Sequence, residues 1–145
     1  MLAVGLWAAL AEPRLAWVAP AGFLAGMAAG GLFGFAGFGP PGVELLILGS
    51  AVVFGALALF RTRTAPVLAF AVAGLFGAAH GVAHGAELPQ GLGWGGYVLG
   101  FLIATAALHA MGAVGGLAAG RAGLPRLGQA AGAAVAVAGA YLMVA

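Results

Sequence analysis

The sequence contains no cysteine and no lysine, and only 6% of its 145 residues are charged. Without cysteine the chain forms no disulfide and offers no thiolate to a metal or a substrate. Soluble domains carry about 25% charged residues, so this chain has too little charge to cover a water-facing surface. The formal net charge of +2 comes from scattered arginines rather than a basic run, which argues against a nucleic-acid partner.

Hydrophobic residues make up 64% of the chain, and they form long runs separated by proline, glycine and charge. Five runs approach the roughly 20 residues that an α-helix needs to cross a bilayer. No period-two alternation appears, which argues against membrane-spanning strands. We therefore expect one all-α integral membrane domain over residues 1–145. It is a polytopic transmembrane helix bundle with a short N-terminal hydrophobic helix at 2–11 and five full spans at 15–38, 43–60, 66–86, 94–117 and 127–145.

The arginines occur only in alternate connections between these runs. Arg14 lies in the first connection, Arg61 and Arg63 in the third, and Arg121 and Arg126 in the fifth. Positive residues gather in the cytoplasmic loops of membrane proteins. This pattern predicts a multi-pass protein of the bacterial inner (cytoplasmic) membrane whose C-terminus, FGPPG loop and ELPQGLG loop lie outside.

Glycine is abundant, with 28 residues, and many glycines recur at every fourth position. Small residues at this spacing let two helices approach closely in lipid. No lysine follows these glycines and no strand precedes them, so they do not resemble a phosphate-binding loop. We expect helix packing along three ridges: Gly22, Gly26, Gly30 and Gly34; Gly77, Gly81 and Gly85; and Gly112, Gly116 and Gly120.

The stretch HGVAHGAE is unusually polar for such an apolar chain. It places His80, His84 and Glu87 four and three residues apart, so on a helix they project within one narrow arc. The glycine ridge that begins at Gly77 lies beside this arc, so the polar face adjoins a surface that should pack against another helix. Ionisable residues inside a membrane usually face the bundle interior or a water-filled cavity.

This set of side chains is suited to binding a metal. Neutral imidazole is the commonest side-chain ligand for borderline divalent metals, and a nearby carboxylate compensates charge. Nitrogen and oxygen ligands without sulfur suit Ni, Co, Zn or Cu(II) better than Cu(I). Two further residues join the set. Glu44 lies at the outer end of its run, and His109 lies roughly 22 Å from the outer end of its span.

Ordered by depth, these residues predict a path for a cation that crosses inward. The metal is then a transported ligand, and no tightly bound cofactor is expected. From the outside inward, the expected metal-binding residues are Glu44, Glu87, His84, His80 and His109.

Each of these residues also has a structural interpretation. Two histidines four residues apart can serve interhelical hydrogen bonding alone, and His109 can be a packing histidine. Glu87 at a helix end can be a solvated interfacial carboxylate, and Glu44 can be a first-turn acid favoured by the helix dipole.

An enzyme is not expected. Intramembrane zinc proteases use His-Glu-x-x-His, in which the glutamate is the general base, but here Gly81 follows His80. Ser50 is the only serine, and it lacks the Gly-x-Ser-x-Gly elbow of serine hydrolases.

Four stretches together resemble the HupE/UreJ family of small membrane proteins. They are LAVGLWAA near the N-terminus, PPGVELL, HGVAHGAELP and GFLIATAALHAMG. The resemblance extends over nearly the whole chain, and HGVAHGAELP is its most specific part. It implies a nickel or cobalt permease associated with nickel supply to hydrogenase and urease. By position, the family's polar residues correspond to Glu44, His80, His84, Glu87 and His109.

The chain departs from the family pattern at its start. Family members usually begin with a further segment that contains a histidine and a Gly-x-Asp-His element, and Met1 stands where that segment would end. Either Met1 is an internal methionine of a longer protein, or the chain lacks those ligands.

The sequence thus predicts a membrane permease for a divalent transition metal, Ni²⁺ or Co²⁺, with a His/Glu site near the outer side. The alternative is a non-transporting membrane scaffold or metal-delivery accessory protein with structural histidines. The expected partners are the metal ion and the lipid bilayer, together with further copies of the chain or nickel-enzyme maturation proteins.

Overall fold

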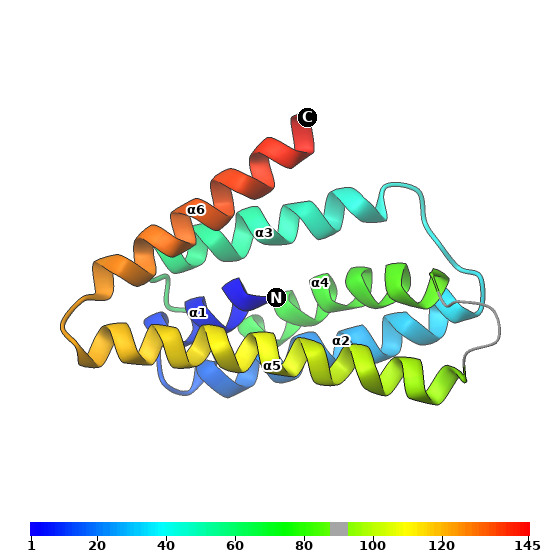
Figure 1. Cartoon of the computed structure of the whole chain (residues 1–145), viewed down its shortest axis with the longest axis horizontal. Coiled ribbons are helices and arrows are strands. Elements are labelled where there is room, and N and C mark those ends of the chain that lie inside the picture. The colour runs from blue at the N-terminus through cyan, green and yellow to red at the C-terminus, as the bar shows by residue number, and fades with distance from the viewer. Residues whose placement is uncertain (88–92) are drawn as a thin grey trace.

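The structure, a computed structural model, describes residues 1–87 and 93–145, and all regular structure in these ranges is α-helical. The helices lie side by side along one long axis, and α6 splays away from the others (Figure 1). In chain order they are α1 Leu2–Ala11, α2 Leu15–Phe35, α3 Val43–Leu59, α4 Pro66–Ala86, α5 Trp94–Arg121 and α6 Pro125–Val144.

The expected all-α membrane bundle is confirmed, but the count of five full spans is not. Within the described ranges, four helices are long and apolar enough to cross a membrane: α2, α4, α5 and α6. Helix α3 has 17 residues and α1 has 10, so both are shorter than the roughly 20 residues of a full crossing. The predicted ELPQGLG loop falls largely on residues 88–92, outside the described part of the chain.

Glycines in the left-handed conformation move two helix ends away from their predicted positions. Helix α2 stops at Phe35 because Gly37 has φ +84°, and the Phe38 amide then donates back to the Phe33 carbonyl. This is the Schellman arrangement that closes many helices. Helix α5 continues to Arg121, past the expected end near 117, until Gly123 makes the same kind of turn with φ +70°.

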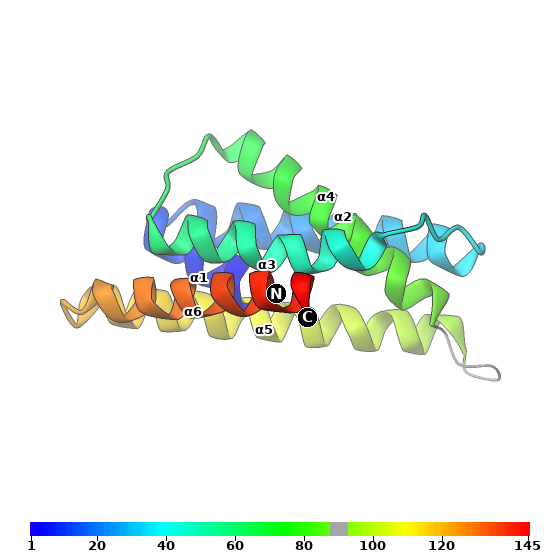
Figure 2. The ribbon, with the colours of Figure 1, turned by 90° about the horizontal axis from the view of Figure 1, so that it is seen from above.

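The helices pack as three pairs. Helix α2 packs along α4, α3 along α6, and α1 along α5. Figure 2, seen from above, shows α3 beside α6 and α2 crossing α4. The α1–α2, α3–α4 and α5–α6 connections lie at one end of the bundle (Figure 1, left), with the arginines in them or in the adjoining helix turns, and we call this the arginine end. The opposite end carries the α2–α3 connection, the end of α4 and the start of α5, and we call it the loop end.

Two predicted glycine ridges face each other, and their packing role is confirmed. A Cβ added at Gly26 or Gly30 of α2 would overlap the carbonyl oxygen of Gly74 or Ala78 on α4. In the other direction, a Cβ at Gly81 would overlap the carbonyl oxygen of Met27. The two backbones therefore touch, as small residues allow in lipid.

The third ridge packs only in part. Gly112 and Gly116 of α5 pack against α1. In the other direction, Gly5 of α1 packs against the α5 backbone at His109. A Cβ added at Gly120 would meet no atom of another helix within 4 Å, so that part of the prediction is wrong. The sequence analysis also missed the glycines that join α3 to α6, which are Gly55, Gly132 and Gly139.

The short helix α1 forms the centre of the core. Trp7, which is 1% exposed, packs its ring against Phe54 of α3, with ring centroids 5.7 Å apart. Its indole Nε1 donates to the Thr62 carbonyl at 2.9 Å, and Arg61 Nε donates to the Leu10 carbonyl at 3.2 Å. Helix α1 is too short to cross a bilayer, and it lies inside the bundle instead.

The α2–α4 contact yields a stability prediction. Replacing Gly26 by alanine should cost about 1–3 kcal/mol, because the added methyl group overlaps the backbone of α4 and forces the helices apart. Thermal unfolding of the purified protein in detergent measures this loss. The matched control is Gly100→Ala on α5, where the added methyl group would meet no atom of another helix within 4 Å. Equal melting temperatures for the two variants would contradict the contact.

Candidate functional site

Helix α4 carries His80 into the interior of the bundle. Its side chain is 8% exposed, and Nδ1 lies 2.8 Å from the Phe76 carbonyl oxygen. A carbonyl oxygen only accepts, so Nδ1 carries the proton and Nε2 keeps its lone pair. An imidazole held in this tautomer by a backbone carbonyl is the usual form of a metal-binding histidine.

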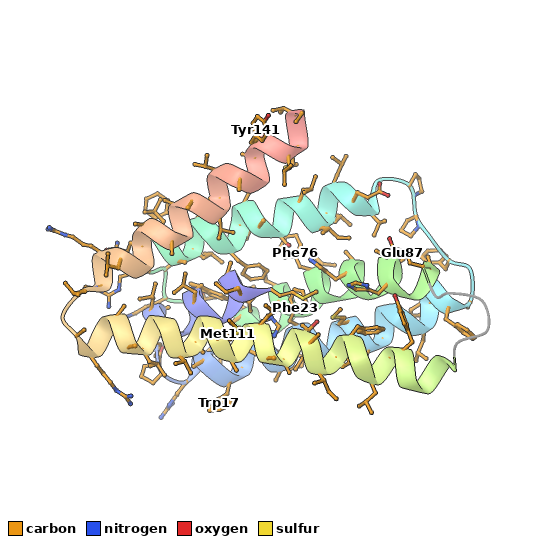
Figure 3. The ribbon with its side chains drawn as sticks, in the orientation of Figure 1. Trp17, Phe23, Phe76, Glu87, Met111 and Tyr141 are labelled. Atoms are coloured by element: carbon orange, nitrogen blue, oxygen red, sulfur yellow. The ribbon has the colours of Figure 1, made fainter. Side chains whose placement is uncertain are left out.

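His84 and Glu87 follow toward the loop end of α4. His84 is half-buried, and its ring stacks on Phe101 of α5 with centroids 5.4 Å apart and planes at 15°. Glu87 is exposed at the C-terminal cap of α4, where Figure 3 labels it near the end of the helix. Both residues therefore lie near the loop end of the bundle, and their role as ligands stays a prediction.

His109 lies in the interior on α5. It is 2% exposed, and neither ring nitrogen has a hydrogen-bond partner. A buried polar group without a partner costs about 1–3 kcal/mol. His109 therefore stands out among the described polar residues, because its ring is buried while both of its nitrogens lack a hydrogen bond.

Phe23 of α2 links the two buried histidines. Its ring centroid lies 5.0 Å from that of His80 and 5.0 Å from that of His109. Phe23 is fully buried, and Figure 3 shows it in the middle of the bundle. The sequence analysis did not single it out, since nothing marks one phenylalanine among nine in such an apolar chain.

Glu44 occupies the first turn of α3 and is exposed. It shares the loop end of the bundle with Glu87. Among the described residues, however, no three His, Cys, Asp or Glu side chains come close enough to hold one metal ion together. The five predicted residues therefore form a series through the bundle rather than one closed coordination sphere.

A further polar group lies one helical turn from His109. Thr105 is 1% exposed, and its Oγ1 lies 3.1 Å from Met1 Sδ and 3.4 Å from Met27 Sδ. The sequence analysis also missed this residue. Its spacing of four residues from His109 places both on one face of α5, and that spacing is the signal that could have found it.

Described residues line a cavity toward each end of the bundle. One of about 370 Å³ is at the loop end, lined by the ends of α2 and α4 at Gly34, Gly37 and Gly85. The other, of about 690 Å³, lies between the first half of α2 and the second half of α5, and its wall includes His109 and Arg121.

Comparison with known proteins shows which family this chain is similar to. The sequence profile of a family described as "HupE / UreJ protein" matches residues 1–142. The chain is also similar to the protein HupE of Rhizobium leguminosarum bv. viciae, with 39% identity over 145 residues. That similarity covers 99% of this chain and 75% of the relative. No solved structure matches the chain.

The unpartnered imidazole yields a second stability prediction. His109→Leu should keep or raise the melting temperature, by about 1 kcal/mol of stability, because it removes two unsatisfied buried nitrogens. Thermal unfolding in detergent tests this. Trp7→Phe is the comparison variant and should lower stability, since it removes the donor to the Thr62 carbonyl. A loss at His109→Leu as large as that at Trp7→Phe would show that the imidazole has a structural role.

Proposed function

This chain belongs to the HupE/UreJ family, and on that premise we propose that it is a permease that carries a divalent transition metal, Ni²⁺ or Co²⁺, into the bacterial cytoplasm. The family is one of transporter-like membrane proteins, which agrees with the apolar helices of the bundle. The metal is the substrate of this function rather than a resident cofactor.

The observation that carries the proposal is the line of imidazoles through the interior. His84 is half-buried near the loop end, His80 lies one turn deeper on the same helix, and His109 lies beyond on α5. Imidazoles are costly inside a membrane unless they serve a polar pathway. A succession of separate ligands also suits transport, because a cation must bind strongly enough to enter and weakly enough to leave.

Each residue of the series has a distinct proposed role. Glu44 and Glu87, which are exposed at the loop end, capture the hydrated cation by charge. His84 and His80 then replace part of its water shell and select for metals that prefer nitrogen. His109 receives the ion on the far side of Phe23.

We further propose that the arginine end faces the cytoplasm. Every arginine of the chain lies in the connections at that end or in the helix turns beside them, as expected for the cytoplasmic side. The protein is then a multi-pass inner-membrane protein with the loop end and the C-terminus outside. On this orientation the metal enters at the carboxylates and leaves near the arginines.

Two contacts favour a second candidate, a membrane scaffold or metal-delivery accessory protein with structural histidines. His80 donates to a carbonyl of its own helix, and His84 stacks flat on Phe101. Both contacts stabilise packing without a metal. The uptake experiment separates the two candidates, since an accessory protein moves no metal when it is the only protein in the membrane.

The metal-uptake prediction concerns the two histidines of α4. His80→Ala and His84→Ala should each reduce accumulation of radioactive nickel by at least about tenfold, because each removes a ligand from the path. Proteoliposomes that contain only the purified protein provide the assay. Glu12→Gln, at the arginine end, is the control and should transport normally. Normal uptake by both histidine variants would overturn the proposal.

Nickel binding should also depend on pH. Only the neutral imidazole ligates a metal, so affinity should fall steeply as the pH is lowered from about 7.5 to about 5.5. Calorimetric titration of the purified protein with Ni²⁺ measures this dependence. Binding that stays constant over the range would mean that carboxylates, not histidines, hold the ion.

A further inference from the structure

The larger cavity is a groove along the outer faces of α2 and α5, and it begins at the arginine end. Helix α2 packs mainly on α4, and α5 packs mainly on α1, so the space between α2 and α5 is left open. Five alanines line this groove, and the larger Trp17 and Val114 in its wall are mostly exposed. In a membrane the groove therefore opens toward lipid.

The groove reaches through only one half of the bilayer. Its wall on α5 extends from Arg121 to Ala106, which corresponds to about 22 Å along the helix. Half of a bilayer, headgroups included, is about 20–22 Å thick. Toward the loop end, the Phe101 ring of α5 lies against Gly31 of α2, so the two helices are in contact there. The groove thus has the length of one lipid molecule rather than that of a membrane-spanning helix.

The wall of the groove is apolar except at the arginine end. His109 is part of the wall, but both of its ring nitrogens are buried away from it. Arg121 lies in the wall at the level of the lipid headgroups, and within the described residues its side chain has no hydrogen bond or ion pair. No described acidic side chain lines the groove. An occupant that fits must join a long apolar chain to an anionic group.

The surroundings of Arg121 favour the same occupant. The arginine end has all five arginines of the chain and only one of its three acidic residues, Glu12. On the orientation proposed above, the groove lies in the cytoplasmic leaflet, where anionic phospholipids are found, and basic pockets between helices on that side bind anionic headgroups. Trp17, which Figure 3 labels at the outer edge of the bundle, is the amphipathic ring expected at that depth.

We propose that this groove binds an anionic phospholipid, with the phosphate on Arg121 and an acyl chain along the alanine-lined wall. The lipid fills the space that α2 and α5 leave open, and it joins the α2–α4 pair to the α1–α5 pair at this level. Because it binds the folded bundle, it also stabilises that bundle. This inference does not depend on the transport of metal.

Native mass spectrometry of the purified protein in detergent tests the headgroup. From an equal mixture of phosphatidylglycerol and phosphatidylcholine with the same acyl chains, the unmodified protein should retain about fivefold more phosphatidylglycerol, the effect of one arginine on an anionic lipid. Arg121→Gln should abolish this preference. Arg126→Gln, on α6, removes the same charge outside the groove wall and should keep it. The proposal is overturned if the unmodified protein shows no preference, or if the two variants bind alike.

The acyl chain is tested by filling the groove. Ala110→Phe places a ring in the groove, whereas Ala107→Phe places one on the same helix outside the wall, and both positions are exposed. Ala110→Phe should reduce the retained phosphatidylglycerol several-fold, and Ala107→Phe should leave it unchanged. Equal retention by the two variants would contradict the site. A dimer of the unmodified protein that only Ala110→Phe abolishes would show that a second copy, not a lipid, occupies the groove.

Discussion

The backbone contact between α2 and α4 is the constraint on which the rest of the bundle depends. Carbonyl oxygens of each helix occupy the space where side chains of the other would begin, as at Gly26 on α2 and Gly81 on α4. Lipid provides no hydrophobic force between helices, so this close packing is what holds them together. It also turns the neighbouring side chains into the interior, and Phe23 and His80 meet there as a result.

This contact accounts for the form of the candidate site. Two helices whose backbones touch leave no room between them for a shell of metal ligands. The imidazoles are instead spread through the bundle, each against an aromatic ring: His84 on Phe101, and His80 and His109 on Phe23. Rings of this kind exclude water without donating strong ligands. Among the described residues the imidazoles therefore form a series of separate groups rather than one cluster of ligands.

Much of the fold could be predicted from the sequence, because proline, glycine and arginine mark where apolar helices must stop. The starts of α2, α3 and α4 lie where they were expected. The ends of α2 and α5 were less predictable, since any of several glycines could have adopted the left-handed turn that Gly37 and Gly123 adopt. Within the candidate site, the position of His80 and His84 on one face of one helix could be predicted from their spacing in the sequence. The contact of His80 with Phe23 could not, because it joins residues 57 positions apart.

By itself the sequence determined that this is a helical membrane protein, which residues carry its polar chemistry, and at which connections its charge gathers. These properties follow from the composition of each segment and from the spacing of its residues, and neither depends on how the helices pack. Only the tertiary structure decided which ridges pair, that Gly120 stays outside them, and that His109 is buried without a partner beside a cavity. Apolar helices of similar composition pack in many ways, and the choice among them depends on how their surfaces fit in three dimensions.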